Sequence, residues 1–410
     1  MEHLPDPREV LFLAHRAPWP PDRGDRIRSW HLLRALSAQA RVHCGCLVEG
    51  VVEPGQAEAI AAITASQCLA PRPASLGWAG IAALATGRPI SVAAFASAEL
   101  ARWVRQTLAD RPIGTIFVFS GQMAQFVPDD FQGRVVMDFV DVDSAKFAAY
   151  AARSRLWPFR LIHAREARVL SAFEQRVAHR ADLSLLVTRE ERDVFVSRMA
   201  SPDGARVEVL HNGIDTAHFS PDAVVPEPAL AGGGPQIVFA GQMDYAPNVA
   251  AVRLFAQSVM PVIRGRHPDA AFFVVGRAPT AEVRALRGVA GTYVTGQVPD
   301  VRPWLAGADC VVAPLQIARG VQNKVLEAMA RARPIVLTRA AATGIAGEDG
   351  VHFAIADGAD ALAARVLALL DNRAAGLAMG GAARALVRDH AGWDHVLAPL
   401  PGMMGWADAA

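Results

Sequence analysis

Short apolar segments alternate with amphipathic ones along most of the chain. Residues 10–14 and 42–48 are apolar runs bounded by turn residues, which is typical of strands buried on both faces. Between them, residues 25–37 repeat apolar side chains at helical spacing, from Ile27 to Leu36. Further runs that predict buried strands lie at 115–119, 134–140, 183–187, 236–240, 271–275, 292–294, 310–313 and 334–337. This alternation predicts parallel sheets with helices on both faces.

A break in the pattern divides the chain of 410 residues, which is long for a single core. Residues 221–235 contain a Pro-Glu-Pro segment and three consecutive glycines, and the alternation restarts after them. We therefore expect an α/β protein with two Rossmann-like doubly wound domains, 1–220 and 236–385, joined by a linker at 221–235 and facing a cleft that holds a ligand. The tail, 386–410, is expected to be helical, and the pattern leaves open whether it packs back on the first domain.

Composition excludes several classes of protein. The 41 basic residues against 40 acidic ones give a formal charge of +1, which argues against a general nucleic-acid partner. The longest charge-free run, residues 73–87, is shorter than the roughly 18–20 residues of a membrane-spanning helix. The start of the sequence lacks the pattern of a signal peptide, and the four cysteines are too scattered for a disulfide framework or a metal site. We expect a cytoplasmic protein without a metal.

The strongest candidate chemistry lies after the strand that ends near Pro314. The following loop carries Arg319 and Gly320, and a helix is expected from about Val321. A glycine at a helix entrance leaves backbone N–H groups free to bind an anion, and the helix dipole favours that binding. This segment therefore predicts an anion site.

Lys324 and Glu327 lie three residues apart, so they project from neighbouring points of one helical face. A cation beside N-terminal amides suits a diphosphate, and a carboxylate one turn further suits the vicinal hydroxyls of a ribose. An exposed Lys–Glu pair on an amphipathic helix has the same spacing, so the spacing alone leaves both interpretations open.

The segment VLEAMARARPIV at 325–336 resembles the E-A-M-A-x-G-x-P-V segment of family 4 glycosyltransferases, which are retaining enzymes of the GT-B fold. Further motifs of that family are matched in order at 210–215, 239–248, 275–277 and 294–314. More narrowly, HRAPWPPDRGDRIRSWHLLRAL at 15–36 and DFVDVDSAKF at 138–147 resemble the glycosyltransferases associated with PEP-CTERM/exosortase exopolysaccharide clusters. Because the motifs occur in family order over nearly the whole chain, the resemblance is specific.

The resemblance implies a hexosyltransferase that moves a sugar from a nucleotide-diphosphate donor, a UDP-sugar, to a lipid-linked or oligosaccharide acceptor in exopolysaccharide biosynthesis. It implies no metal and no cofactor. Lys324 would neutralise the leaving diphosphate, and Glu327 would hold the ribose hydroxyls. The other residues that the resemblance places at the donor are Gly24 and Gly241 with Gln242 beside the phosphates, Val298 at the base, and the loop residues Arg319, Gly320 and Val321.

The sequence departs from the family pattern at three places. Arg319 stands where the family has a carboxylate that contacts the donor sugar, and Gln242 stands where it often has a basic residue. In place of a histidine after the strand at 134–140, the sequence offers aspartates, of which Asp141 is our candidate for orienting the acceptor or stabilising the sugar cation. A turn or N-cap role for Asp141 is equally open. Two other functions also stay open: a nucleotide-sugar epimerase of GT-B architecture, and a non-catalytic sugar-nucleotide-binding protein.

A basic stretch at 153–180 contains seven arginines and only two acidic residues. Trp157 and Phe159 are interleaved with its arginines, and only Glu166 and Glu174 oppose them. Such a stretch can lie on an anionic membrane surface, which would suit an enzyme with a lipid-linked acceptor on the inner face of the cytoplasmic membrane. A solvated helix face is the alternative.

Overall fold

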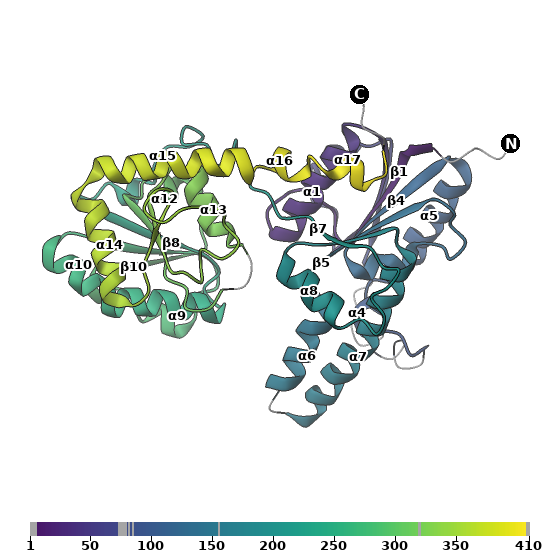
Figure 1. The fold of residues 1–410 in the computed structure, drawn as a ribbon, viewed down its shortest axis with the longest axis horizontal. Helices are drawn as coiled ribbons and strands as arrows, with labels where there is room; N and C mark the ends of the chain where they lie inside the picture. Colours follow the sequence, from purple (N-terminus) through teal and green to yellow (C-terminus); the bar gives the residue numbers. More distant parts are fainter. Residues whose placement is uncertain are drawn as a thin grey trace. The chain divides into compact units, whose positions relative to one another are not determined.

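The structure is a computed structural model that describes residues 6–72, 80, 83, 86–154, 156–318 and 321–406. The chain forms two compact units, the first comprising Met1–Asn212 with Val396–Ala410 and the second comprising Gly213–His395. Each unit contains a parallel sheet with helices on both faces (Figure 1). The predicted α/β class with two Rossmann-like domains is therefore confirmed.

The first unit is built on a seven-stranded sheet in the order β3-β2-β1-β4-β5-β6-β7. The strands are β1 (Asp6–Ala14), β2 (Arg41–Val48), β3 (Ser66–Pro71), β4 (Ile113–Phe119), β5 (Arg134–Val140), β6 (Leu183–Leu186) and β7 (Val207–Val209). In the centre, Leu11 on β1 lies opposite His43 on β2 and Ile116 on β4. Every residue of β4 is buried, because helices cover both faces of the sheet.

The helices of the first unit follow the strands in alternation. They are α1 (Gly24–Ser37), α2 (Gln56–Ala61), α4 (Ile90–Ala93), α5 (Ala98–Asp110), the 3₁₀ turn η1 (Gly121–Phe126), α6 (Asp143–Arg153), α7 (Trp157–Arg180), α8 (Arg189–Ser197) and, near the C-terminus, α17 (Leu400–Met403). Hydroxyl groups fix two of the starts: Ser97 accepts from the Leu100 amide, and Thr188 accepts from the Glu191 amide. Helices α6 and α7 pair as a hairpin that projects from the rest of the unit (Figure 1).

The second unit is built on a six-stranded sheet in the order β10-β9-β8-β11-β12-β13. Its strands are β8 (Gln236–Ala240), β9 (Ala271–Val275), β10 (Thr292–Gly296), β11 (Cys310–Ala313), β12 (Ile335–Leu337) and β13 (Ala354–Ile355). Its helices are η2 (Pro228–Leu230), α9 (Ala246–Leu254), the π-helical turn η3 (Phe255–Val259), α10 (Met260–Arg266), α11 (Ala281–Arg284), η4 (Val289–Gly291), α12 (Arg302–Ala306), α13 (Asn323–Ala330), α14 (Ala359–Asp371) and α15 (Arg373–His390), followed along the chain by α16 (Trp393–Leu397). Helices α9, α10 and α14 lie on one side of the sheet and α12, α13 and α15 on the other (Figure 1).

Several predicted boundaries differ from the structure. The helix expected from Val321 begins at Asn323, and the single helical tail is instead split among α15, α16 and α17, with breaks near Gly392 and Pro399. Strands β3, β7 and β13 were not predicted. The edge strands β3 and β7 are mostly half-buried and lack a continuous apolar run, and β13 has only two residues.

Residues 213–235 group with the second unit, where Leu230 is buried in its core. In the first unit, Arg134 donates to the Met403 carbonyl at 3.0 Å, which ties α17 to β5. Within the described ranges, no helix is both long enough and apolar enough to cross a membrane.

Candidate functional site

Lys324 lies in the first turn of α13, beside the loop that follows β8. Its Nζ donates a hydrogen bond of 2.6 Å to Oδ1 of Asn248, and Asn248 Nδ2 donates one of 2.8 Å to the carbonyl of Gln242. The same ammonium lies 4.9 Å from the ring centroid of Phe239, on β8. These contacts hold a single cation at the carboxyl edge of the sheet, where α/β folds bind their ligands.

Two glycines bring backbone without side chains of its own close to Lys324. A Cβ at Gly241 would lie 3.3 Å from Lys324 Nζ and 2.9 Å from Asn248 Nδ2. A Cβ at Gly276, which has a φ of 153°, would lie 1.6 Å from the Gly241 carbonyl oxygen. The loops after β8 and β9 therefore approach each other as only glycines allow, and they leave backbone beside the cation.

Burial perturbs both ionisable groups of α13. Desolvation lowers the pKa of Lys324 to about 8, although the negative charge of Glu327 opposes the shift. Desolvation likewise raises the pKa of Glu327 to about 7, with the Lys324 charge opposing it. Among the described residues, no side chain donates a hydrogen bond to the Glu327 carboxylate. A partly desolvated cation and a carboxylate without a donor are the groups that a polar ligand can still satisfy.

The other residues that the sequence predicts at the sugar-donor site differ in how the structure places them. The side chain of Gln242 accepts a hydrogen bond of 3.0 Å from Arg277, so its amide is held beside the glycine loop. Val298 and Val321 are half-buried against the core of the second unit. Arg319 and Gly320 lie outside the described residues. The structure therefore brings Lys324, Gly241 and Gln242 together around Asn248.

Asn248 and Arg277 were missed as site residues from the sequence. Both lie within the matched motifs, but their contacts run between loops that are distant along the chain. The Pro-Asn pair at the start of α9 was the available signal, because an asparagine there can reach the preceding loop.

The carboxyl edge of the first unit carries two strained residues. Ser120, directly after β4, has a φ of 77°, and Val140, at the end of β5, has a φ of 70°. Non-glycine residues rarely adopt this left-handed region, and such strain often clusters at functional sites. The backbone is anchored there by Asp138, whose carbonyl accepts from the Ser120 amide at 2.8 Å.

A buried ion pair, also missed from the sequence, underlies this edge. Arg28 on α1 donates to the Asp138 carboxylate at 2.8 Å, and both side chains are almost fully buried. The same guanidinium donates to the His211 carbonyl and to Asn212 Oδ1, each at 3.0 Å. Arg28 therefore joins α1, β5 and the segment after β7.

Asp141 follows β5 at this edge. Helix α6 begins at Asp143 with Val142 in the N-cap position, so Asp141 is not the N-cap residue. Its carboxylate instead accepts from Lys146 Nζ at 2.9 Å, and Lys146 also donates to Asp143 at 3.0 Å. The carboxylate remains partly exposed, with 36% of its side-chain surface accessible.

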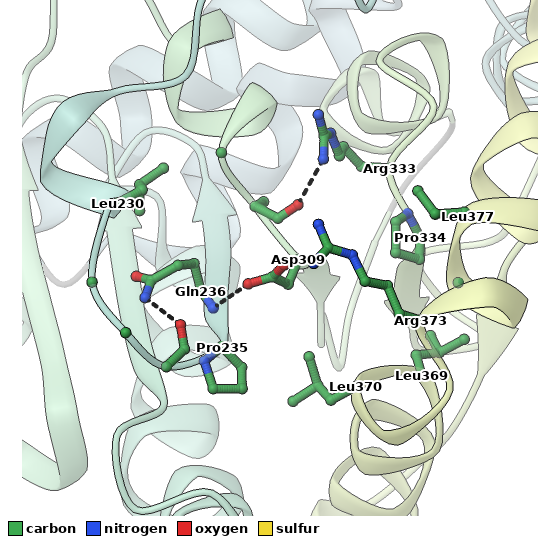
Figure 2. Close-up of a pocket in the computed structure, with 16 residues that line it drawn as sticks. Leu230, Pro235, Gln236, Asp309, Arg333, Pro334, Leu369, Leu370, Arg373 and Leu377 are labelled. Atoms are coloured by element: carbon green, nitrogen blue, oxygen red, sulfur yellow. Dashed lines mark hydrogen bonds between the residues drawn. The ribbon is translucent and has the colours of Figure 1, made fainter.

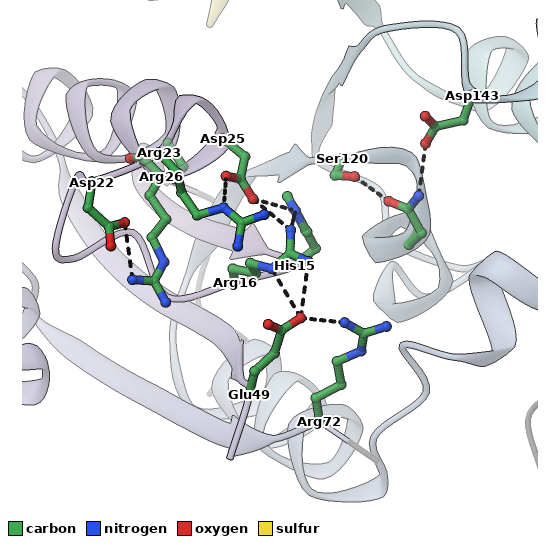
Figure 3. A network of polar contacts seen from close by, with 12 residues as sticks. His15, Arg16, Asp22, Arg23, Asp25, Arg26, Glu49, Arg72, Ser120 and Asp143 are labelled. Atoms are coloured by element: carbon green, nitrogen blue, oxygen red, sulfur yellow. Dashed lines mark hydrogen bonds and ion pairs between the residues drawn. The ribbon is translucent and has the colours of Figure 1, made fainter. Parts of the chain in front are cut away.

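A network of charged side chains surrounds the start of α1 (Figure 3). His15 Nε2 lies 3.2 Å from the Asp25 carboxylate, and Arg16 donates to the same carboxylate at 2.7 Å. Burial opposes ionisation of Asp25, but the hydrogen bonds from His15 and Arg16 hold its pKa well below its usual range. Gly24 begins α1 and is exposed, and a Cβ at this position would have no atom within 4 Å, so the backbone beside this network is accessible.

The same network extends to the ends of β2 and β3. Arg16 donates to Glu49 at 3.0 Å, and Arg72 donates to the same carboxylate (Figure 3). Within the described part of the chain, no group of three or more His, Cys, Asp and Glu side chains is arranged to hold a metal ion.

Part of the second unit is similar to a known protein family. Residues 234–372, within the second unit, match the family described as Glycosyl transferases group 1. The second unit carries a glycosyl transferases group 1 domain. No curated protein matches the chain by sequence.

Solved structures match almost the whole chain. Sucrose-phosphate synthase from Thermosynechococcus elongatus has 14% sequence identity and a TM-score of 0.62, over 97% of this chain and 98% of that one. HepE of Anabaena, solved in complex with UDP and glucose, has 14% identity and a TM-score of 0.62, over 97% and 99%. WaaG, a glycosyltransferase involved in lipopolysaccharide biosynthesis, has 16% identity and a TM-score of 0.63, over 97% and 100%. The chain has the GT-B fold.

Proposed function

We propose that the protein is a family 4 retaining glycosyltransferase that moves a hexose from a UDP-sugar to a lipid-linked or oligosaccharide acceptor in exopolysaccharide biosynthesis. The observation that carries the proposal is the partly desolvated Lys324, held by Asn248 beside the backbone of Gly241. The group 1 domain match supports it, as do the complexes of HepE, a protein of the same fold, with UDP and with UDP-glucose. The resemblance to PEP-CTERM/exosortase-associated enzymes supports the exopolysaccharide role.

Cleavage of the sugar–phosphate bond builds negative charge on the departing diphosphate. A fixed ammonium and helix-terminal amides, already oriented toward that charge, stabilise it without reorganisation. Lys324 would supply the ammonium, and the amides at the start of α13 would lie beside it. Loss of one such group costs about 3 kcal/mol of transition-state stabilisation in other enzymes. We propose that this arrangement makes a metal or cofactor unnecessary.

The other groups have complementary roles in the proposal. Glu327, which accepts no hydrogen bond from a described side chain, would accept hydrogen bonds from the hydroxyl groups of the ribose. Gln242 would line the phosphate side, Val298 would present its backbone to the base, and the loop from Arg319 to Val321 would contact the donor. Gly24 would let the amides of α1 approach the diphosphate.

Asp141 would act on the acceptor side. Its pairing with Lys146 fixes the direction of a carboxylate that is still exposed. A carboxylate so placed could orient an acceptor hydroxyl or stabilise the positive charge that develops on the sugar.

Release of UDP from UDP-sugars tests the proposal. The wild-type protein is expected to release UDP slowly in water and faster with a lipid-linked acceptor extract. Lys324→Ala and Glu327→Ala should reduce that rate, the lysine variant by about a hundredfold or more. Arg365→Ala, an exposed change on α14, is the control and should retain the wild-type rate. Isomerised nucleotide sugar without UDP release would indicate an epimerase instead, and binding without any turnover would indicate a sugar-nucleotide-binding protein.

The tip of the α6–α7 hairpin supports a peripheral contact with an anionic membrane. Trp157 is 73% exposed and Phe159 is 55% exposed, and further large apolar side chains are exposed beside them: Tyr150, Leu156, Leu161 and Ile162. So many exposed apolar residues at the end of a projecting hairpin are costly in water, and such clusters usually mark an interaction site. Arg155 lies outside the described residues.

The two glutamates of α7 lie in the interior of the unit, and among the described residues only Arg165 forms an ion pair with one of them, at 3.8 Å from Glu166. Glu166 is buried and accepts from the amides of Ile90 and Ser91, both at 2.8 Å. Glu174 is also buried and accepts from the Ser144 amide at 3.0 Å. The exposed side of the helix therefore combines aromatic rings with arginines such as Arg160, which suits the interface of an anionic membrane.

Flotation with vesicles tests this contact. The protein is expected to float with vesicles that contain phosphatidylglycerol and to float less with purely zwitterionic ones. Trp157→Ser with Phe159→Ser should abolish flotation, whereas Val225→Ser, an equally exposed apolar change elsewhere, should not. Equal flotation of all variants would contradict the role of the hairpin tip.

A further inference from the structure

A pocket of about 490 Å³ lies at the amino-terminal edge of the second sheet (Figure 2). Gln236 begins β8, and Asp309 and Pro334 directly precede β11 and β12, so three adjacent strands start at its wall. The end of α14 and the first turn of α15 close another side. This edge is the opposite one from that of Lys324, because Lys324 lies beside the loop that leaves the carboxyl end of β8.

The guanidinium groups of Arg333 and Arg373 line this pocket, and their positive charges are only partly offset by neighbouring groups. Arg333 donates to the Ala308 carbonyl at 3.2 Å, and Arg373 forms no ion pair or hydrogen bond with a described side chain. Burial lowers the pKa of Arg333; Asp309 opposes that effect and the positive charge of Arg373 adds to it. The single carboxylate, Asp309, is partly engaged, because it accepts from the Gln236 amide at 2.9 Å.

Arg373 also stands where a helix disfavours a cation. It is the first residue of α15, an 18-residue helix that has no acidic residue in its first turn. The positive end of the helix dipole repels it, and Arg333 repels it as well. Arg373 is an exposed residue, and an anion bound between the two arginines would offset both of these repulsions.

The rest of the pocket lining suits the organic part of a small ligand. The side chains of Leu369, Leu370 and Leu377 contribute an apolar part, and the run Gly232–Gly234 contributes backbone without side chains (Figure 2). Two guanidiniums match the geometry and charge of a phosphate monoester. We propose that this pocket binds a small organic phosphate, with the phosphate held by Arg333 and Arg373 and the organic part against the leucines. This inference is independent of the proposed transferase function.

Calorimetric titration of the full chain with inorganic phosphate and with phenyl phosphate, at constant ionic strength, tests the site. All variants are built on Lys324→Ala, so that phosphate bound at the other edge does not contribute. Arg373→Gln should weaken both ligands about tenfold or more, since it removes a charged hydrogen-bonding partner. The matched control is Arg388→Gln, in the last turn of the same helix, which should bind like its parent.

Two further results separate a binding role from a structural one. Asp309→Asn keeps an oxygen for the Gln236 amide but removes the competing charge, so it should tighten phosphate binding several-fold. In buffer without phosphate, Arg373→Gln should not lower the unfolding midpoint, because the exposed arginine forms no ion pair or hydrogen bond with a described side chain. Equal affinity of the Arg373→Gln and Arg388→Gln variants, absence of binding in the Lys324→Ala parent, or destabilisation by Arg373→Gln would each overturn the proposal.

Discussion

The affinity for a diphosphate should depend steeply on pH near the pKa of Lys324. Burial lowers that pKa to about 8, so raising the pH through this value converts the ammonium to a neutral amine. Only the ammonium attracts a diphosphate. We therefore expect the affinity for UDP to be greatest below pH 8 and to fall as the pH rises.

The size of the effect follows from the fraction of Lys324 that is protonated. For a pKa of about 8, that fraction falls from about nine-tenths at pH 7 to about one-tenth at pH 9. If bound UDP keeps the lysine protonated, its affinity falls by about tenfold over this range, or ~1.4 kcal/mol. The direction of the effect is definite. When a ligand raises the pKa of a base in the protein, binding is accompanied by uptake of a proton at that base, so the affinity falls at alkaline pH.

Calorimetric titration with UDP at pH 7, 8 and 9 measures this dependence. Lys324→Arg is the matched control, because a guanidinium stays protonated throughout the range and any titration of UDP itself affects both proteins equally. Glu327, whose pKa is about 7, also changes charge in this range but does so in both proteins, so we expect the wild type to lose about tenfold more affinity than the control between pH 7 and 9. The same slope in both proteins would refute the assignment of the cation to Lys324.

Two further predictions concern stability, one at the carboxyl edge of the second sheet and one at the carboxyl edge of the first. Gly276→Ala should lower the free energy of unfolding by about 2 kcal/mol or more, because its Cβ would collide with the Gly241 carbonyl. Gly265→Ala is the control and should not lower it, because no atom lies within 4 Å of a Cβ at that position. Urea denaturation measures both variants, and equal effects would contradict the close approach of the two loops. Arg28→Met should cost about 3–5 kcal/mol by leaving the Asp138 carboxylate buried without its partner, and adding Asp138→Leu should restore much of the loss. A double variant no more stable than Arg28→Met would show that the ion pair is not the cause.

Much of the sheet architecture could be predicted from the sequence. The runs at 134–140, 236–240 and 271–275 match β5, β8 and β9 residue for residue, because a strand covered on both faces is mostly apolar along its length. The edge strands β3 and β7 escaped prediction, since one exposed side removes that requirement. The start of α13 was misplaced by two residues, which is the usual uncertainty at a helix end.

The candidate site was predicted in part. Lys324 and Glu327 were singled out because their spacing is local to one helix and their motif is contiguous. Asn248 was not, since its bond to Lys324 joins residues 76 apart in the sequence. Arg28 and Asp138 escaped for the same reason, because nothing in a single sequence shows which buried charges become partners.

The sequence by itself determined the alternation of strands and helices, the position of the motif that carries Lys324 and Glu327, and the absence of a strong net charge. These properties depend on side-chain periodicity and on neighbours in the chain. Only the tertiary structure decided the chemistry of individual groups. Three features depend on burial and on contacts between distant segments. They are the lowered pKa of Lys324, the inward orientation of Glu166 and Glu174 that leaves arginines and aromatic rings exposed on α7, and the presence of Arg333 and Arg373 in one pocket. Desolvation and charge pairing are properties of three-dimensional neighbours, and the chain acquires those neighbours only when it folds.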